Sequence, residues 1–207
     1  TAEYDFEYDI YDVREDVFPV GPEVCDSWII TGSKSGVYEN QEWMQRLKTL
    51  IMEIHQQQKP LLGICFGHQI IADAFSGSVA QYTGGWGIGL HNYTFVGEHD
   101  FVLKGPADFS LNAMHQDQVL VKPESAKVLA HSPFCPFAAL QYDDRILTFQ
   151  AHPEFDVTFE TRLVEHLRGK SVPKDKADQA LEGLTVPTAA TDSTAIAHWM
   201  ANFLQRG

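Results

Sequence analysis

Hydrophobic and polar positions indicate that strands and helices alternate in the first third of the chain. Residues 28–31 form a short apolar run, typical of a buried strand. Apolar side chains then recur every three or four positions from Trp43 to Ile54, which predicts an amphipathic helix with Asn40 as its N-cap. A second apolar run follows Pro60 and leads directly into another helical pattern. This alternation predicts a parallel sheet covered by helices.

The first ten residues have a different pattern. Aromatic or aliphatic side chains at positions 4, 6, 8 and 10 alternate with acidic side chains at positions 3, 5, 7 and 9. A period of two is typical of a strand with one buried face. We therefore expect residues 3–10 to form a half-buried strand with an acidic outer face.

Beyond Gly77 the apolar segments become short. Residues 89–96, 126–131, 138–142 and 146–150 are separated by turns, which predicts antiparallel strands added to the parallel core. Residues 156–168 have a helical pattern, and another lies near the end of the chain. Its apolar positions are Ile196, Trp199, Met200, Phe203 and Leu204. Residues 169–190 are interpreted as a surface connection. The whole chain, 1–207, is thus predicted to be one α/β domain.

Composition excludes several classes of function. The formal charge of -13 argues against nucleic acid as a partner, because phosphate binding needs a basic surface. No apolar run approaches the length of a membrane span, so no membrane association is expected. Cys25, Cys65 and Cys135 are odd in number and have no metal-binding spacing. A reducing, cytoplasmic location is the simplest interpretation.

The most informative stretch is the sequence Gly-Ile-Cys-Phe-Gly at residues 63–67. It joins the apolar run after Pro60 to a helical pattern. Glycines on both sides allow a tight strand-to-helix turn, so the pattern is that of a nucleophile elbow with Cys65 in place of serine. Such a turn exposes the sulfur at a helix N-terminus, which favours the thiolate. A lone cysteine is more often a buried core residue, but the two glycines favour the nucleophile.

A thiol nucleophile needs a base, and among nine histidines His152 is the best candidate. It follows an apolar strand pattern within Gln150-Ala151-His152-Pro153-Glu154-Phe155. Catalytic residues are often found at the ends of sheet strands. Glu154, two residues on, is close enough in sequence to orient the imidazole. On the His-Pro-Glu tripeptide alone, a solvated loop histidine is the preferred interpretation.

Together these residues resemble the class I glutamine amidotransferase family. The resemblance rests on the 63–69 segment with its Gly-Ile-Cys-Phe-Gly-His-Gln sequence, on His152-Pro153-Glu154, on the turn at residues 31–33, and on residues 114–119. It covers about residues 26–155. It implies a three-layer, doubly wound, mostly parallel sheet of flavodoxin type with antiparallel additions. It also implies an upstream strand and helix that precede the region where this sequence begins.

The resemblance further implies a role for each matched residue. Cys65 attacks the side-chain amide of glutamine to form a γ-glutamyl thioester and release ammonia, while His152 transfers protons and Glu154 orients His152. Backbone N–H groups of Phe66, Gly32 and Ser33 form the oxyanion hole. The glutamine backbone groups are held by Gln69, Met114, His115 and Gln116. His68 is expected to be structural, and no metal or cofactor is implied.

The resemblance leaves the substrate and partner open. The donor is glutamine or another γ-glutamyl compound, and a separate synthetase or ammonia-accepting protein is an expected partner. A γ-glutamyl peptidase that uses the same thioester is one alternative. A binding or regulatory protein without turnover is another, and reaction of Cys65 with a γ-glutamyl electrophile distinguishes it from both enzymes.

Overall fold

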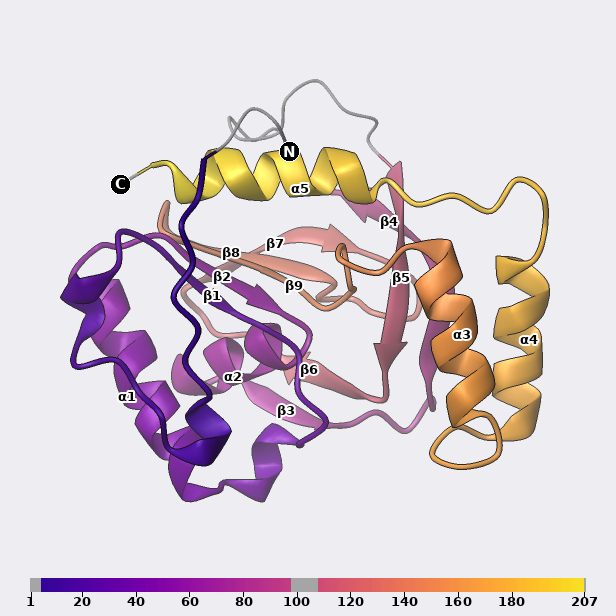
Figure 1. The fold of residues 1–207 in the computed structure, drawn as a ribbon, viewed down its shortest axis with the longest axis horizontal. Helices are drawn as coiled ribbons and strands as arrows, with labels where there is room; N and C mark the ends of the chain where they lie inside the picture. The colour runs from indigo at the N-terminus through magenta and orange to yellow at the C-terminus, as the bar shows by residue number, and fades with distance from the viewer. Residues whose placement is uncertain (1–4, 98–107, 207) are drawn as a thin grey trace.

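A seven-stranded sheet forms the centre of the molecule, in the order β1-β2-β9-β8-β7-β4-β5 (Figure 1). The computed structural model describes residues 5–97 and 108–206. The strands of this sheet are β1 (Trp28–Ile30), β2 (Leu61–Ile64), β4 (Gly87–Phe95), β5 (Asp108–His115), β7 (Ala126–His131), β8 (Ala139–Tyr142) and β9 (Ile146–Phe149). Strands β1, β2 and β9 are parallel, and the other pairings are antiparallel. A second, antiparallel sheet joins β3 (Ser78–Gln81) to β6 (Asp117–Val121).

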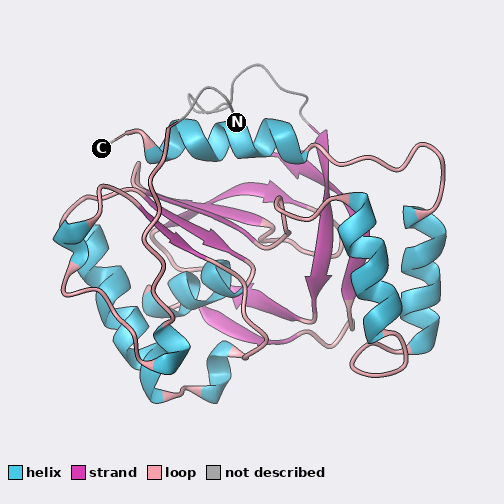
Figure 2. Cartoon of the chain, in the orientation of Figure 1, coloured by secondary structure: helices cyan, strands magenta, loops and turns pink. Residues whose placement is uncertain are grey.

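Helices cover both faces of the sheet (Figure 2). They are α1 (Glu42–Gln56), α2 (Phe66–Ala74), α3 (Val157–Leu167), α4 (Lys174–Leu184) and α5 (Ser193–Leu204). Three short 3-10 helices lie at Val13–Glu15, Pro22–Val24 and Val37–Glu39. In the described parts of the chain, no helix combines the length and the apolar character needed to cross a membrane.

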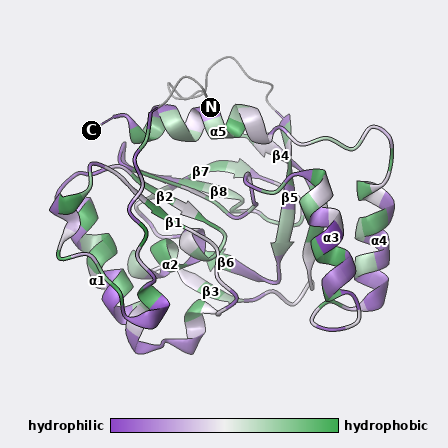
Figure 3. Cartoon of the chain, viewed as in Figure 1, coloured by the Kyte–Doolittle hydropathy of each residue, from purple (hydrophilic) through white to green (hydrophobic). Residues whose placement is uncertain are grey.

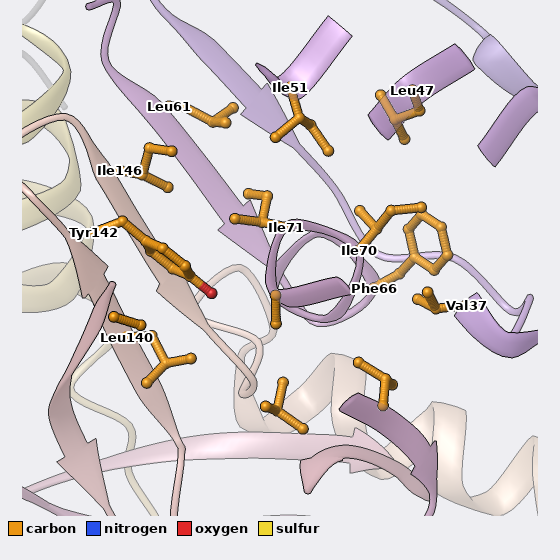
Figure 4. Packing of buried hydrophobic residues seen from close by; sticks show 14 of the residues in the cluster. Val37, Leu47, Ile51, Leu61, Phe66, Ile70, Ile71, Leu140, Tyr142 and Ile146 are labelled. Carbon is orange, nitrogen blue, oxygen red and sulfur yellow. The ribbon is translucent and has the colours of Figure 1, made fainter. Parts of the chain in front are cut away.

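The two faces of the central strands contribute to two different cores. Leu61 of β2 packs with the buried faces of α1 and α2, whereas the next residue, Leu62, packs with α5. In β9, Ile146 likewise packs in the core with α1 and α2, and the next residue, Leu147, packs in the core with α5. Side chains alternate between the two faces along a strand, so neighbouring residues enter different cores. Figure 4 shows α2 between α1 and the sheet. The three-layer α/β arrangement with antiparallel additions is therefore confirmed, and its parallel part comprises β1, β2 and β9.

A third, smaller core lies where α3 and α4 pack beside each other against β4. Its buried residues are Ile88, Val164, Val172, Ala177, Ala180 and Leu184. Figure 3 shows hydrophilic colour on the outward sides of α1, α3 and α4, as expected for helices that bury one stripe. Helix α3, which contributes Val164 to this core, begins at Val157, shortly after the segment that contains His152. Packing of α3 in this core therefore helps to position that segment.

The start of α2 passes very close to β1 and β2. A Cβ atom on Gly67 would lie 2.1 Å from the carbonyl oxygen of Ile30, and one on Gly63 would lie 2.8 Å from the carbonyl oxygen of Gly67. Any side chain at either position would therefore clash with backbone. The glycines at the elbow are required by this close approach, as the sequence predicts.

Two predicted elements are wrong. Residues 5–10 do not form a strand, and Tyr8 and Ile10 are exposed, because a period-two pattern has no stability without a neighbouring strand to pair with. Positions 3 and 4 of that expected strand lie outside the described residues. The expected surface connection at 169–190 contains α4, which buries Ala177, Ala180 and Leu184.

Smaller corrections concern boundaries and strands. Asn40 is the C-cap of the 3-10 helix Val37–Glu39, in the left-handed conformation, and Gln41 occupies the N-cap of α1. Strand β1 lies at the edge of the sheet, so Ile29 is 38% exposed and the strand is not fully buried. Strands β3, β5 and β6 were not predicted, since polar side chains interrupt their patterns.

The close approach at the elbow predicts opposite effects for one substitution at two helical glycines. Gly67→Ala should lower the free energy of unfolding by about 1–3 kcal/mol or more, because the methyl group meets the Ile30 carbonyl. Gly183→Ala in α4 should raise it by up to about 1 kcal/mol, since a Cβ there meets no atom within 4 Å. Urea unfolding of both variants measures the difference. Equal effects at the two positions would contradict the proposed packing.

Candidate active site

Cys65 lies at the junction of β2 and α2, in the predicted elbow. Its φ of 52° and ψ of -101° are unusual for a residue with a side chain, and such backbone strain is often found at functional sites. The first hydrogen bond within α2 runs from the N–H of Gln69 to the carbonyl of Cys65. The N–H groups of the first helical turn, Phe66 included, therefore have no acceptor within the helix and are available near the sulfur.

The elbow is tied to β9, the strand that leads to His152. The N–H of Cys65 donates to the carbonyl of Phe149 at 2.8 Å. Three residues later, the N–H of His152 donates to the carbonyl of Asn112 in β5, at 2.9 Å. The Asn112 side-chain amide in turn donates to the carbonyl of Phe155 at 3.0 Å. Hydrogen bonds from both sides thus fix the backbone around His152.

The side chains of Cys65, His152 and Glu154 form a connected series. The Nδ1 of His152 hydrogen-bonds to Oε1 of Glu154 at 2.7 Å, and Cys65 acts on the His152 ring strongly enough to raise its pKa. Because Nδ1 faces Glu154, the ring presents Nε2 to the sulfur. The imidazole also stacks on Phe155, with ring centroids 4.1 Å apart. Sequence reasoning missed Asn112, which lies outside the quoted motifs, and gave no role to Phe155, which ends the quoted His152 segment.

The charge state of His152 follows from these contacts. Burial on its own lowers the pKa of His152, but the hydrogen bonds and charges of Cys65 and Glu154 outweigh it and raise the pKa to about 10. The imidazole therefore carries a proton near neutral pH.

The turn at residues 31–33 lies against this pair. A Cβ on Gly32 would lie 3.3 Å from Cε1 of His152 and 3.8 Å from Cβ of Cys65. The hydroxyl of Ser33 accepts a hydrogen bond from the N–H of Ser35, which shapes the turn. Cys65 is only 7% exposed, so the elbow presents the sulfur less openly than expected. The surrounding segments account for this, because both the Gly32 turn and His152 lie against Cys65.

Gln69 and His115 were predicted to bind substrate, and both are buried beside the elbow. The amide nitrogen of Gln69 donates to the carbonyl of Asp117 at 2.9 Å and to Oε1 of Gln150 at 3.1 Å. Nδ1 of His115 donates to the same Asp117 carbonyl at 3.1 Å. Burial, with the nearby His91, lowers the pKa of His115 to about 3, so its ring is neutral. Gln69 thus holds the β5–β6 turn against α2, and His115 closes the turn itself.

The other two residues predicted to bind substrate lie next to this turn. Met114 is near the end of β5, and Gln116 lies between β5 and β6. Met114 is half-buried against the core formed by α3 and α4. Gln116 is half-buried, and its side chain accepts a hydrogen bond from Gln81 at 3.0 Å. His68, expected to be structural, is fully buried, and its Nδ1 hydrogen-bonds to the Thr148 hydroxyl at 2.8 Å. Burial lowers the pKa of His68 to about 3, which is consistent with a neutral ring in the core.

Comparison with known proteins identifies the family. The family model for "Glutamine amidotransferase class-I" matches residues 7–167, most of the chain. The chain belongs to the class I glutamine amidotransferase family. The matched region includes the elbow at Cys65 and the His152-Pro153-Glu154 segment.

Individual members of this family resemble the chain to different extents. Gamma-glutamyl peptidase 3 of Arabidopsis thaliana is 29% identical, over 96% of this chain and 83% of the peptidase. A GMP synthase (glutamine-hydrolysing) component of Methanococcus aeolicus is 36% identical, over 48% of this chain and 53% of that component. A solved glutamine amidotransferase from Thermotoga maritima has the same fold, with a TM-score of 0.74, 20% identity, and coverage of 95% of this chain and 86% of that one.

The raised pKa of His152 predicts how stability depends on pH. A histidine whose pKa is raised in the folded state stabilises that state below the unfolded pKa of about 6.5, and this stabilisation is lost as the pH rises through about 10. Glu154→Gln removes one cause of the shift. It should therefore lower the free energy of unfolding at pH 6, by about 1.4 kcal/mol for each unit by which the His152 pKa falls, and have no such effect above pH 10.

Urea unfolding at pH 6 and above pH 10 measures this difference, with Glu165→Gln on the exposed side of α3 as the matched control. A loss of stability in Glu154→Gln that is equal at both pH values would show that the carboxylate does not act through the charge of His152.

Proposed function

We propose that this chain hydrolyses the amide bond of γ-glutamyl compounds, with glutamine as donor, through a Cys65–His152–Glu154 triad. The observation that carries the proposal is the 2.7 Å hydrogen bond between His152 and Glu154 at the elbow, where the Gly32 turn lies against both His152 and Cys65. A nucleophile, a base and an orienting acid placed side by side are the arrangement that acyl transfer requires. The family to which the chain belongs supports the same chemistry.

In the proposed reaction, Sγ of Cys65 attacks the γ-carbonyl carbon as a thiolate, its proton having passed to His152. His152 then gives this proton to the leaving nitrogen, the C–N bond breaks, and a γ-glutamyl thioester remains on Cys65. Water attacks the thioester after losing a proton to Nε2 of His152. The thiolate leaves, and glutamate is released. The raised pKa of His152 supports this sequence, because the imidazole holds the proton that the leaving amine needs.

The negative oxygen that forms during attack needs hydrogen-bond donors. The N–H of Phe66 is at the start of α2, where the helix provides no acceptor for it. The Gly32–Ser33 turn lies beside Cys65, since a Cβ on Gly32 would lie 3.8 Å from Cβ of Cys65. We assign the oxyanion hole to these backbone groups. In this assignment the pocket for the donor's amino and carboxylate groups is shaped by Gln69, Met114, His115 and Gln116.

A second candidate differs only in the leaving group. The peptidase of Arabidopsis thaliana matches 96% of this chain, whereas the GMP synthase component matches 48%. This difference in coverage favours a γ-glutamyl peptide as donor, in which case an amine leaves in place of ammonia. With glutamine as donor, a separate partner protein accepts the ammonia, and we place the enzyme in the cytoplasm.

A panel of donors tests the proposal and separates its two forms. Purified chain is offered glutamine, γ-glutamyl dipeptides and the matching α-glutamyl dipeptides, and the release of ammonia or amine is measured. We expect hydrolysis of γ-glutamyl donors only. Cys65→Ser should lose nearly all turnover, because an alcohol is far less ionised than a thiol. His152→Ala should lose about 10²–10⁴-fold.

Cys25→Ser is the matched control, because Cys25 lies outside the series of residues connected to His152. It should keep full turnover. Unchanged turnover in Cys65→Ser would refute the nucleophile. If the panel, with or without added partner proteins, gives no hydrolysis and Cys65 does not react with a glutamine-like diazo-ketone, the chain is a binding protein.

A further inference from the structure

A third carboxyl group lies on the helix that follows the His152–Glu154 segment. Glu160, in the first turn of α3, is fully buried, although glutamate is among the residues least often found in protein interiors. Helix α3 begins directly after the His152-Pro153-Glu154 segment, with Asp156 as its N-cap. Glu160 is therefore one helical turn beyond the end of the segment that contains the proposed base.

The Glu160 side chain connects α3 to β4. Its Oε1 accepts a hydrogen bond from the N–H of Gly89 at 3.2 Å. Gly89 has a φ of +80°, and a Cβ there would lie 3.2 Å from Cβ of Ala180 in α4. A side chain at position 89 would thus be strained and crowded, so glycine is required where the backbone presents its N–H to the carboxyl. The second oxygen, Oε2, has no hydrogen-bond partner among the described side chains and backbone.

Few charges reach this carboxyl group. The titratable groups that act on it are His152 and Glu154. The residues that α4 buries are Ala177, Ala180 and Leu184, which carry no charge, and its pair with α3, Arg168–Asp178, is exposed. On β4 the titratable groups are His91, whose pKa burial lowers, and Tyr93, whose pKa burial raises. An ionised Glu160 would therefore have His152 as its principal positive neighbour.

Burial raises the pKa of Glu160 to about 7, while the Gly89 hydrogen bond and His152 partly oppose this shift. The carboxyl is thus neutral below about pH 7 and ionised above it. In contrast, the side chain of Glu154 is 44% exposed, so solvent screens its charge more strongly.

We propose that Glu160 is a positioning residue of this active site, which anchors the segment carrying His152 to β4 and, once ionised, strengthens the hold of His152 on its proton. The inference rests on the proposed role of His152 as the base. The anchoring comes from the hydrogen bond to Gly89, and the electrostatic effect comes from a charge in a dry interior, where attraction between charges is stronger than at the surface.

The test is a titration of the histidine ring signals by NMR in the full chain. Spectra of the wild type are compared with those of Glu160→Gln, which retains an acceptor for Gly89, and of the exposed control Glu165→Gln on the same helix. The wild-type His152 signal should shift once near pH 7, as Glu160 ionises, and again as the ring loses its proton. In Glu160→Gln the first shift should vanish, and the ring should lose its proton about one pH unit earlier. Glu165→Gln should match the wild type.

A His152 titration that is the same in Glu160→Gln and the wild type would overturn the proposal. If Glu160→Gln does not fold, the wild-type titration alone tests the proposal. A His152 titration curve without a step near pH 7 would refute the electrostatic coupling between Glu160 and His152. Because the titration needs no turnover, it stands apart from the donor panel. Hydrolysis with an unchanged titration refutes only the role of Glu160, and coupling without hydrolysis refutes only the proposed function.

Discussion

The structure of the site depends on one steric constraint, the contact between the start of α2 and the strands beneath it. A Cβ on Gly67 would lie 2.1 Å from the carbonyl of Ile30, so the helix can approach β1 only with glycine at that position. The approach places Cys65 in a strained conformation with a φ of 52°, and the hydrogen bond to Phe149 holds it there. Packing of Phe66, Ile70 and Ile71 in the core around α2 offsets the cost of this strain (Figure 4).

The two parts of the sheet supply different parts of the site. The parallel strands β1, β2 and β9 provide the Gly32 turn, Cys65 and the segment that leads to His152. The antiparallel strand β5 provides the Asn112 carbonyl that receives the N–H of His152. Segments far apart in the sequence thus meet at the ends of neighbouring strands, where the sites of α/β proteins are often built.

The sequence predicted those features that depend on local chemistry. The spacing of Gly63 and Gly67 identified the elbow, because only glycine fits such close backbone contacts. Contacts between residues far apart in the sequence could not be predicted from local patterns. The alternation at residues 5–10 resembles a strand, but no local pattern reveals whether a partner strand is present. Helix α4 was missed because two of its three buried residues are alanines, which give a weak apolar signal. Glu160 lies on the same stripe as Val164, and a charge among apolar positions was an available signal of a buried carboxyl.

The central claim is that Cys65 forms a covalent γ-glutamyl thioester. The most direct test is to stop the reaction with acid during turnover of glutamine or a γ-glutamyl dipeptide, digest the protein, and determine by mass spectrometry where the chain is modified. The account predicts one added γ-glutamyl group, on the peptide that contains Cys65, and none in Cys65→Ser. Turnover with an adduct on another residue, or a Cys65→Ser chain that still forms the adduct elsewhere, would contradict it.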